Sequence, residues 1–291
     1  MSTDAIVYLN GAFLPIGEAK VSVLDRGFIY GDGVYEVIPV YGRKPFRMPH
    51  HLARLQRSLD GIRLANPHGD AEWTSLVETI VERQPFDDQA VYLQITRGVA
   101  KRDHAFPSGV SPTVFMMSNP LVVPTREQVE RGVAVVTAED NRWHRCDLKT
   151  TSLLGNVLMR QLAADANAVE TVMFRDGFLT EASASNVMIV RGGKVIAPPK
   201  DNLILPGITY DAAQEITRAA GVPLEIRPVP KDEALGADEM WLSSSTREVL
   251  AVTTIDGRTF AGGTPGPVFR RIHAAFQDAK RAGAAIPSAV A

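Results

Sequence analysis

Lys149 is the residue whose type and setting most directly suggest covalent chemistry. It lies in the segment RCDLKTTSLLGN, between a predicted strand and a predicted helix, with Leu148 before it and three hydroxyl residues after it. A lysine in a partly dry pocket can act as an amine nucleophile toward an aldehyde. A solvated lysine at the start of a helix explains the same position, and spacing alone favours that simpler interpretation.

Glu181 is the second residue that could take part in chemistry. It lies in FLTEASASNV, in the middle of a predicted strand, where glutamate is disfavoured. An inward carboxylate could pair with the protonated ring nitrogen of a cofactor and make that ring a better electron sink. Ser183, Ser185 and Asn186 follow closely and could bind the same ring. A surface charge and solvent-facing strand residues explain these positions equally well.

Two further segments could hold an anion. Leu205-Pro206-Gly207-Ile208-Thr209 leads into a predicted helix, whose first N–H groups can bind a phosphate, and Thr209 adds a hydroxyl. Ser243 to Thr246 is a run of hydroxyl residues at the end of an apolar strand, and Arg54 on another predicted helix could supply positive charge. A plain helix start, a serine-rich loop and a surface arginine explain the same features.

The elements that must position these residues alternate between strands and helices. Apolar spacing predicts strands at 6–9, 34–41, 90–96 and 112–117 and helices at 49–64 and 72–84. Later strands are predicted at 133–137, 170–174, from Asp176-Gly177 to near Val190, and over 240–253; later helices are predicted at 152–166, 209–220 and 267–281. We therefore expect a mixed α/β fold with a small N-terminal domain at 1–118, a proline-containing linker at 119–128 and a larger, cofactor-binding domain at 129–291.

Composition restricts the class of protein. The chain has 291 residues, 45% hydrophobic and 22% charged, with a net charge of -2 and no basic stripe, so we expect no nucleic-acid partner. The apolar runs fall short of the ~20 residues of a membrane span, and no signal peptide is recognised, so we expect neither a membrane partner nor secretion. Cys146 is the only cysteine, which excludes an internal disulfide, argues against a cysteine-rich metal site and suits the cytoplasm.

The order of these features resembles the fold-type IV pyridoxal-phosphate enzymes, also called class IV aminotransferases. The resemblance runs from DRGFIYGDGVYEV (Asp25 to Val37), through Lys149, Glu181 and LPGIT, to SSSTREV (Ser243 to Val249). It implies a two-domain fold, pyridoxal 5'-phosphate as cofactor, and a homodimer that acts on small amino and 2-oxo acids.

The resemblance also implies a role for each candidate residue. Lys149 would form the Schiff base with the cofactor and move the proton of the substrate α-carbon, and Glu181 would pair with the pyridine nitrogen. The phosphate would be held by Arg54, Ile208, Thr209, Ser244 and Ser245. The remaining cofactor contacts would come from Ser185, Asn186, Leu205 and Gly207.

The segment TRGVAKRDHAFP indicates which substrate is bound. Arg102 and His104 could trap a carboxylate, and they resemble the carboxylate-binding loop of D-amino acid aminotransferases, in which a tyrosine at the position of Tyr35 completes the trap. We therefore expect D-amino acids such as D-alanine and D-glutamate to be transaminated, with 2-oxoglutarate or pyruvate as acceptor, in a ping-pong cycle. A polar surface loop explains Arg102 and His104 without any such role.

Other interpretations remain open on sequence grounds. LPGIT is common among branched-chain L-amino acid aminotransferases, which are the first alternative, ahead of R-selective amine aminotransferases and aminodeoxychorismate lyase. Four residues depart from the D-specific pattern: Ala184, Pro206, Tyr210 and Arg247. A non-catalytic pyridoxal-phosphate binder and an α/β protein without a cofactor are the alternatives from other classes.

Overall fold

The computed structural model describes residues 5–283, and its internal contacts divide the chain into two compact units. Unit 1 contains the chain up to Leu121 together with Leu148–Leu153, and unit 2 contains Val122–Asp147 and the chain from Leu154 onward. The sequence prediction assigned every residue after 128 to the second domain. Leu148–Leu153 instead groups with unit 1, because Thr150 forms a β-bridge with Val34 and Thr151 hydrogen-bonds to Gly33.

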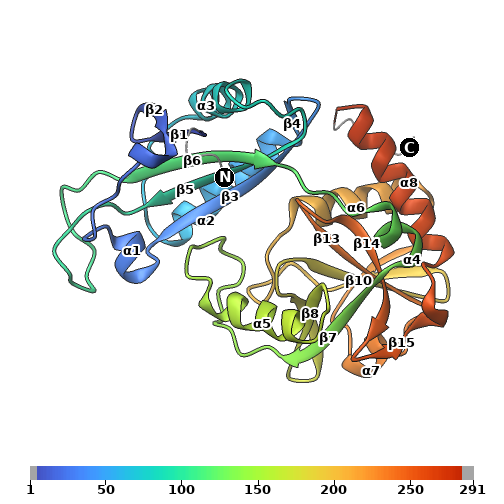
Figure 1. Cartoon of the computed structure of the whole chain (residues 1–291). Coiled ribbons are helices and arrows are strands. Elements are labelled where there is room, and N and C mark those ends of the chain that lie inside the picture. The colour runs from blue at the N-terminus through green and yellow to red at the C-terminus, as the bar shows by residue number, and fades with distance from the viewer. Residues whose placement is uncertain (1–4, 284–291) are drawn as a thin grey trace. The chain divides into compact units, whose positions relative to one another are not determined.

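Unit 1 is built on a six-stranded antiparallel sheet in the order β2-β1-β6-β5-β3-β4 (Figure 1). Its strands are β1 (Ile6–Leu9), β2 (Ala12–Pro15), β3 (Gly33–Tyr41), β4 (Lys44–Pro45), β5 (Gln89–Thr96) and β6 (Thr113–Pro120). Its helices are α1 (Arg26–Tyr30), α2 (Met48–Gly61) and α3 (Asp70–Glu82). The sequence therefore predicted the main strands and the two longer helices, but not the single-turn α1.

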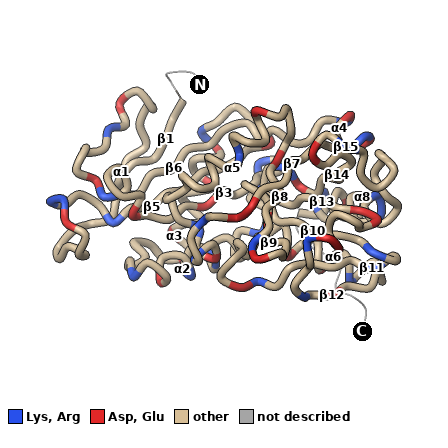
Figure 2. The backbone as a smooth tube through the Cα atoms, turned by 90° about the horizontal axis from the view of Figure 1, so that it is seen from below, with Lys and Arg blue, Asp and Glu red and all other residues tan. Residues whose placement is uncertain are grey.

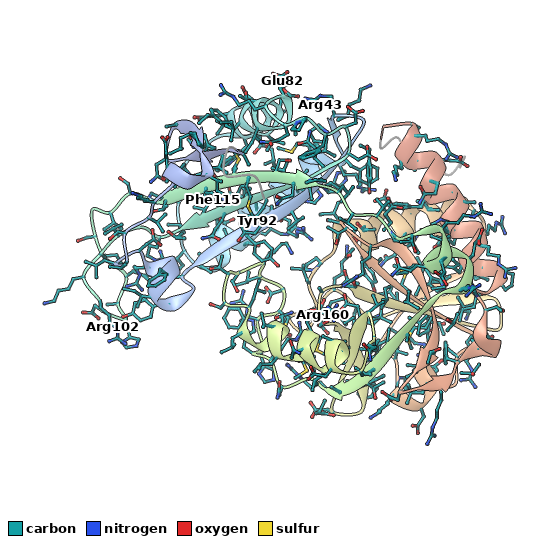
Figure 3. All side chains as sticks on the ribbon, viewed as in Figure 1. Arg43, Glu82, Tyr92, Arg102, Phe115 and Arg160 are labelled. Carbon is teal, nitrogen blue, oxygen red and sulfur yellow. The ribbon has the colours of Figure 1, made fainter. Side chains whose placement is uncertain are left out.

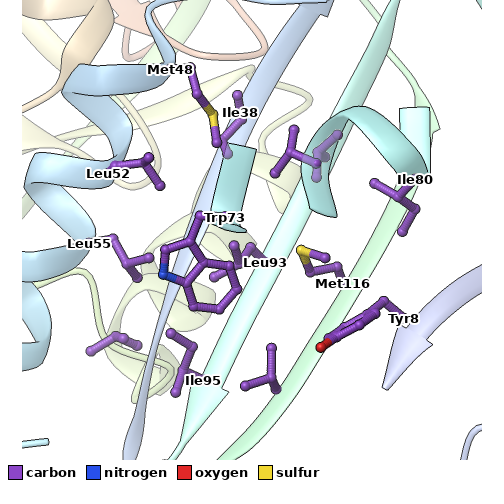
Figure 4. Close-up of a cluster of buried hydrophobic side chains, with 14 of the residues drawn as sticks. Tyr8, Ile38, Met48, Leu52, Leu55, Trp73, Ile80, Leu93, Ile95 and Met116 are labelled. Carbon is purple, nitrogen blue, oxygen red and sulfur yellow. The ribbon is translucent and has the colours of Figure 1, made fainter. Parts of the chain in front are cut away.

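The core of unit 1 forms where α2 and α3 meet the sheet. Leu52, Leu55 and Leu59 repeat at helical spacing along α2 and are buried, as that spacing predicts. They join Trp73 of α3 and alternate residues of β5 such as Leu93 in one apolar cluster (Figure 4). This cluster fixes α2 on the sheet, and α2 carries Arg54 and Ser58 on its buried side.

Unit 2 is built on a nine-stranded mixed sheet in the order β12-β11-β10-β13-β14-β7-β8-β9, with β15 paired to β14. Its strands are β7 (Val133–Glu139), β8 (Glu170–Arg175), β9 (Phe178–Ala182), β10 (Asn186–Arg191), β11 (Lys194–Ala197), β12 (Leu224–Ile226), β13 (Glu239–Ser244), β14 (Glu248–Ile255) and β15 (Arg258–Thr259). Its helices are α4 (Arg126–Arg131), α5 (Leu154–Asp165), α6 (Ile208–Ala219), α7 (Lys231–Leu235) and α8 (Pro267–Arg281).

One strand prediction for unit 2 was wrong in detail. The single strand expected from Asp176-Gly177 to Val190 is two strands, because Ser183–Ser185 turns the chain and Ala182 N–H donates to the Ser185 carbonyl at 2.7 Å. Within the expected linker, β6 continues to Pro120 and α4 begins after Thr125, whose side chain forms a capping box with Gln128. The mixed α/β class itself is confirmed.

Figure 2 shows Lys and Arg interspersed with Asp and Glu along the chain rather than gathered in long runs of one sign. Among the residues that the structure describes, no helix is long and apolar enough to cross a membrane. Residues 5–283 also contain no cluster of His, Cys, Asp and Glu that could hold a metal ion.

Candidate active-site residues

Lys149 is positioned by β3 and α2 within unit 1. Tyr35 N–H donates to the Lys149 carbonyl at 2.9 Å, and Lys149 N–H donates to Ser58 Oγ at 3.2 Å. The amine Nζ lies 4.2 Å from the centroid of the Tyr35 ring, and that ring stacks on Tyr92. The lysine is half-buried rather than fully solvated. The structure therefore brings together two of the predicted site residues, Lys149 and Tyr35.

Arg54 is buried beside Glu36 and His51. Its Nε and Nη2 atoms donate to the two Glu36 oxygens at 2.8 and 2.7 Å, and His51 Nδ1 lies 2.8 Å from Glu36 Oε2. Burial raises the pKa of Glu36, but Arg54 and then His51 outweigh it and hold that pKa well below its ordinary value. Burial also lowers the pKa of His51. Arg54 is thus a rigidly held cation and not the surface arginine of the alternative interpretation.

Glu181 lies at the centre of a buried polar cluster in unit 2. Its Oε1 accepts from Arg142 Nη1 at 2.7 Å, and its Oε2 accepts from Leu205 N–H at 2.9 Å and from Asn186 Nδ2 at 3.1 Å. Burial raises the pKa of Glu181 to about 7, despite the opposing effect of Arg142. The carboxyl is therefore poised to share a proton with a basic nitrogen near neutral pH.

The positive charge of Arg142 does not fully neutralise the Glu181 carboxylate, because Arg142 also pairs with Asp140. Arg142 Nε and Nη2 donate to the Asp140 carboxylate at 3.0 and 2.9 Å, and Arg175 pairs with the same carboxylate at 3.0 Å. Burial raises the pKa of Asp140, but its hydrogen bonds to Arg142 outweigh this and lower it. Asp140 therefore remains charged and draws part of the Arg142 interaction away from Glu181.

The start of α6 forms a candidate anion site next to Glu181. Gly207 is the N-cap residue and has no side-chain cap, so the first N–H groups of α6 have no side-chain partner at the cap. A Cβ at Gly207 would lie 2.1 Å from Asn186 Oδ1, so only glycine fits beside Asn186. Asn186 also donates to the Leu205 carbonyl at 2.8 Å, which ties the LPGIT segment to β10.

Ser243 extends this candidate site; it belongs to the predicted run of hydroxyl residues, from which the family resemblance selected Ser244 and Ser245. Ser243 pairs with Asn186 across β10 and β13, and its buried Oγ has no hydrogen-bond partner among the described residues. Ser244 and Ser245 are half-buried, and Ser244 Oγ accepts from Arg247 N–H at 3.1 Å. An unpartnered buried hydroxyl beside an open helix start fits a bound phosphate.

The turn at 183–185, which follows Glu181, is fixed by hydrogen bonds to the buried carboxylate of Glu170. Ser185 Oγ donates to Glu170 Oε1 at 2.8 Å, Ser183 Oγ donates to Glu170 Oε2, and Arg247 Nε lies 3.0 Å from Glu170 Oε1. Ser185 was predicted to contact the cofactor, and its hydroxyl donates to Glu170 instead. Arg247, a departure from the expected pattern, is explained as the counter-ion of a fully buried glutamate.

Arg102 and His104 lie in the exposed segment between β5 and β6. His104 packs against the Tyr30 ring with 5.4 Å between centroids, and the Arg102 guanidinium carbon lies 5.6 Å from the same ring. Figure 3 shows Arg102 at the far end of this segment, well away from Tyr92, on which Tyr35 stacks. Within one chain the predicted carboxylate trap is therefore not brought together.

Several residues that shape the site were not selected from the sequence. Four charged residues are buried, and each forms an ion pair with a residue many positions away in the sequence: Glu36, Asp140, Arg142 and Glu170. Strand alternation offered a weak signal for Glu36, which follows Tyr35 within an apolar strand. The other three carry no local signal that separates them from surface charges.

The residues present in unit 2 fit the ring and phosphate of pyridoxal phosphate. Glu181 provides a buried carboxyl near its neutral point, and the uncapped start of α6 with Ser243 provides donors for an anion. In unit 1, Lys149 provides the amine and Arg54 a buried cation.

Comparison with known proteins gives a consistent family. The model of the amino-transferase class IV family matches residues 33–255. D-alanine aminotransferase of Bacillus licheniformis is 39% identical over 272 residues, covering 94% of this chain and 96% of that protein. D-alanine aminotransferase of Staphylococcus aureus (strain N315) is 38% identical, covering 93% and 96%.

Solved structures share the fold. The branched-chain aminotransferase of the thermophilic archaeon Thermoproteus uzoniensis, solved with norvaline, superposes with a TM-score of 0.87 at 26% identity, covering 96% of this chain and 95% of that one. A hypothetical aminotransferase from Mycobacterium tuberculosis in a PLP-bound form superposes with a TM-score of 0.82 at 26% identity, covering 95% and 98%.

Proposed function

Because the chain belongs to the class IV aminotransferase family, we propose that it uses pyridoxal 5'-phosphate to transfer the amino group of D-amino acids to a 2-oxo acid. D-alanine and D-glutamate are the proposed donors, and 2-oxoglutarate or pyruvate the acceptor. The observation that carries this proposal is the identity of 38–39% to D-alanine aminotransferases over almost the whole of both chains. The Arg102–His104 pair supports the same substrate class.

The cofactor would be held by the residues described above. Lys149 would attach it covalently, and Glu181 would pair with its ring nitrogen through the poised carboxyl. Ile208 and Thr209 would bind the phosphate at the start of α6, together with Arg54, Ser244, Ser245 and, as the structure suggests, Ser243. When bound, the cofactor supplies an electron sink that stabilises negative charge at the substrate α-carbon.

Lys149 would also act as the acid–base group of the proposed reaction. Its free amine would take the proton from the substrate α-carbon and, within the same half-reaction, deliver it to the cofactor carbon that carries the amino group; the second half-reaction would move a proton in the opposite direction. Tyr35 lies against this amine, 4.2 Å from ring centroid to Nζ, and limits the directions from which Nζ can approach the substrate. The hydrogen bonds from Lys149 to Ser58 and from Tyr35 to the Lys149 carbonyl fix the backbone from which it acts.

The substrate carboxylate would be bound by Arg102, His104 and Tyr35. Since these residues lie apart in one chain, we propose that the enzyme is a homodimer in which Arg102 and His104 act with Tyr35 of the partner copy. Exposed apolar residues support an interface on both units. Unit 1 exposes Val21, Val23, Leu24, Phe28 and Val99 (the unit 1 patch), and α5 exposes Leu154, Val157, Leu158 and Leu162 (the α5 stripe).

We place this activity in the cytoplasm. The single cysteine, Cys146, is buried, and burial raises its pKa to about 11, so its thiol stays protonated and unreactive. A protein without disulfides suits a reducing compartment.

A branched-chain L-amino acid aminotransferase is the second candidate, favoured by the TM-score of 0.87 to a branched-chain aminotransferase. The experiment that separates the two offers D-alanine and L-leucine in parallel, with pyridoxal phosphate and 2-oxoglutarate. We expect keto acid from D-alanine only, together with a visible absorption band of bound cofactor.

Each other outcome has a defined meaning. Turnover of L-leucine alone would move the chain to the branched-chain group. Absence of a cofactor band would overturn the assignment of Lys149. An Arg102→Ala variant that kept its full rate on low concentrations of D-alanine would overturn the assignment of the carboxylate-binding segment.

A further inference from the structure

The exposed segment between β5 and β6 lacks regular structure, yet it would have to hold Arg102 and His104 in fixed positions. Every residue from Lys101 to Phe106 is exposed. An exposed irregular segment is ordinarily mobile, and ordering it costs conformational entropy. Some contact beyond the segment itself must therefore set its geometry, if it is to bind a carboxylate with useful affinity.

Arg26 of α1 makes that contact. Its Nη1 donates to the Asp103 carbonyl at 2.6 Å and lies 3.4 Å from the Ala105 carbonyl, so one guanidinium nitrogen spans the main chain on both sides of His104. Arg26 is 4% exposed, so these bonds are largely shielded from water. They join positions 77 and 79 residues apart in sequence.

Arg26 is itself held in place by the half-buried carboxylate of Asp32. Its Nε donates to Asp32 Oδ2 at 2.7 Å, and Arg97 Nε donates to the same oxygen at 2.8 Å. Burial raises the pKa of Asp32, but the hydrogen bonds to Arg97 and Arg26 outweigh this and lower it. The ion pair with Asp32 uses only the Nε atom of Arg26. The Nη1 atom therefore remains available to bind the main chain of the segment between β5 and β6.

Tyr30, at the other end of α1, completes the support. Its ring lies 4.8 Å from the Arg26 guanidinium carbon and 5.6 Å from that of Arg102, and it packs against His104. The base of the segment is closed by Arg26 N–H, which donates to the Gly98 carbonyl at 2.9 Å. One short helix thus contacts the main chain and both functional side chains.

We infer that Arg26 is a positioning residue for substrate binding, which acts by holding Arg102 and His104 in the geometry that receives the substrate carboxylate. This inference rests on the proposed function of that pair. Arg26 does not touch the substrate, and its effect is confined to ligands that carry a carboxylate, which include both the amino donor and the 2-oxo acceptor.

The test compares Arg26→Gln, Arg26→Lys and Arg102→Ala with the native enzyme in steady-state assays on D-alanine and 2-oxoglutarate. We expect Arg26→Gln to raise KM for both substrates about tenfold, with kcat and the cofactor Kd within about twofold, because only carboxylate binding is loosened. Arg26→Lys should fall between the native enzyme and Arg26→Gln, since lysine keeps the charge but not the second donor direction.

Arg43→Gln is the matched control. Arg43 also donates to main-chain carbonyls of unit 1, at Val81, Glu82 and Gln84, and it lies near Glu82 at the opposite end of the unit from Arg102 (Figure 3). It should leave both KM values within about twofold of the native ones. A double variant, Arg26→Gln with Arg102→Ala, should raise KM by less than the product of the two single effects, because Arg26 acts in part through Arg102.

Five results would count against the inference or its premise. Native KM values in Arg26→Gln beside raised ones in Arg102→Ala would overturn the inference and leave the proposed function intact. Native KM values in Arg102→Ala would overturn the premise. Fully additive effects in the double variant, or a fall in kcat and cofactor affinity without a KM change, would show a general structural role. If Arg26→Gln does not fold, unchanged KM values in Arg26→Lys overturn the inference.

Discussion

The pKa values of the buried carboxyls Asp140 and Glu181 depend on a partner that the two residues share, Arg142. Arg142 bonds both Asp140 and Glu181, so neither carboxylate receives the whole of its charge. Asp140 also has Arg175 and Thr180 and stays charged, whereas burial dominates at Glu181 and raises its pKa to about 7. The same polar cluster of unit 2 therefore provides one permanent charge and one carboxyl that can exchange a proton.

The raised pKa of Glu181 predicts a pH-dependent stability of the cofactor-free protein. A carboxyl with a folded pKa of about 7 and an ordinary value of 4.5 favours folding below pH 4.5, and this contribution is lost as the pH rises to about 7. The glutamine side chain of the Glu181→Gln variant does not ionise, so the stability of this variant does not decrease for this reason as the pH rises. The native free energy of unfolding should therefore fall by about 3 kcal/mol relative to that of Glu181→Gln between pH 4.5 and pH 8.

Urea unfolding of the cofactor-free proteins at a series of pH values measures this difference. Glu130→Gln serves as control for the loss of a carboxylate, because Glu130 pairs with Arg126 on an exposed surface and lies outside the buried cluster. A native-to-variant difference that does not change with pH would mean that Glu181 ionises like an ordinary surface carboxyl.

At the scale of elements, α6 depends on a close approach that only glycine permits. Gly207 has a φ of -70°, which any residue can adopt, so its requirement comes from Asn186 and not from backbone strain. Asn186 in turn binds Glu181 and the Leu205 carbonyl. A displaced Asn186 would therefore disturb both the carboxyl and the start of α6.

Gly207→Ala should weaken cofactor binding by about tenfold to a hundredfold while the protein stays folded, because the added methyl displaces Asn186 and tilts the first turn of α6. Titration of the cofactor-free protein with pyridoxal phosphate, followed by visible absorbance, gives the Kd. Gly69→Ala is the matched control, since Gly69 is the N-cap residue of α3 and a Cβ there meets no atom within 4 Å. Equal Kd values for the two variants would contradict this account of α6.

The elements that the sequence predicted well are those specified by local periodicity. α8 begins at Pro267 and ends at Arg281 as predicted, because proline starts it and apolar residues repeat along one face. The break at Ser183–Ser185 was not predicted, since it depends on hydrogen bonds to Glu170 from another strand. α1 was missed because one turn shows no periodicity, although Asp25 and Gly31 mark its two ends.

The site residues divide in the same way, into those with a local sequence signal and those that depend on distant partners. Lys149 and Glu181 stood out because their local settings are unusual, and the LPGIT segment because glycine precedes a helix. Arg142, Glu36 and Glu170 did not, because a buried arginine or glutamate is recognised only once its distant partner is known. Long-range pairing of charges is therefore the part of the site that a single sequence does not reveal.

At the scale of the whole molecule, the exposed apolar side chains require an explanation. The α5 stripe has the spacing of a buried helix face, yet Leu154 and Leu158 are 72% and 58% exposed. Phe28 of the unit 1 patch is 72% exposed. Apolar side chains gathered in this way are normally covered by another chain, and a second copy is the partner proposed above.

Replacing Leu158 or Phe28 with aspartate should separate the copies, because a charge in a desolvated interface is costly. Light scattering after gel filtration should give twice the chain mass of 31.6 kDa for the native protein and 31.6 kDa for each variant. Turnover of D-alanine should fall at least about tenfold, since Arg102 and His104 would lose the partner's Tyr35. Ile226→Asp, on an exposed position of β12 outside both surfaces, should remain dimeric and active. A native protein that is fully active at 31.6 kDa would instead require each chain to bind the substrate carboxylate alone, and the roles of Arg102 and His104 would have to be reassigned.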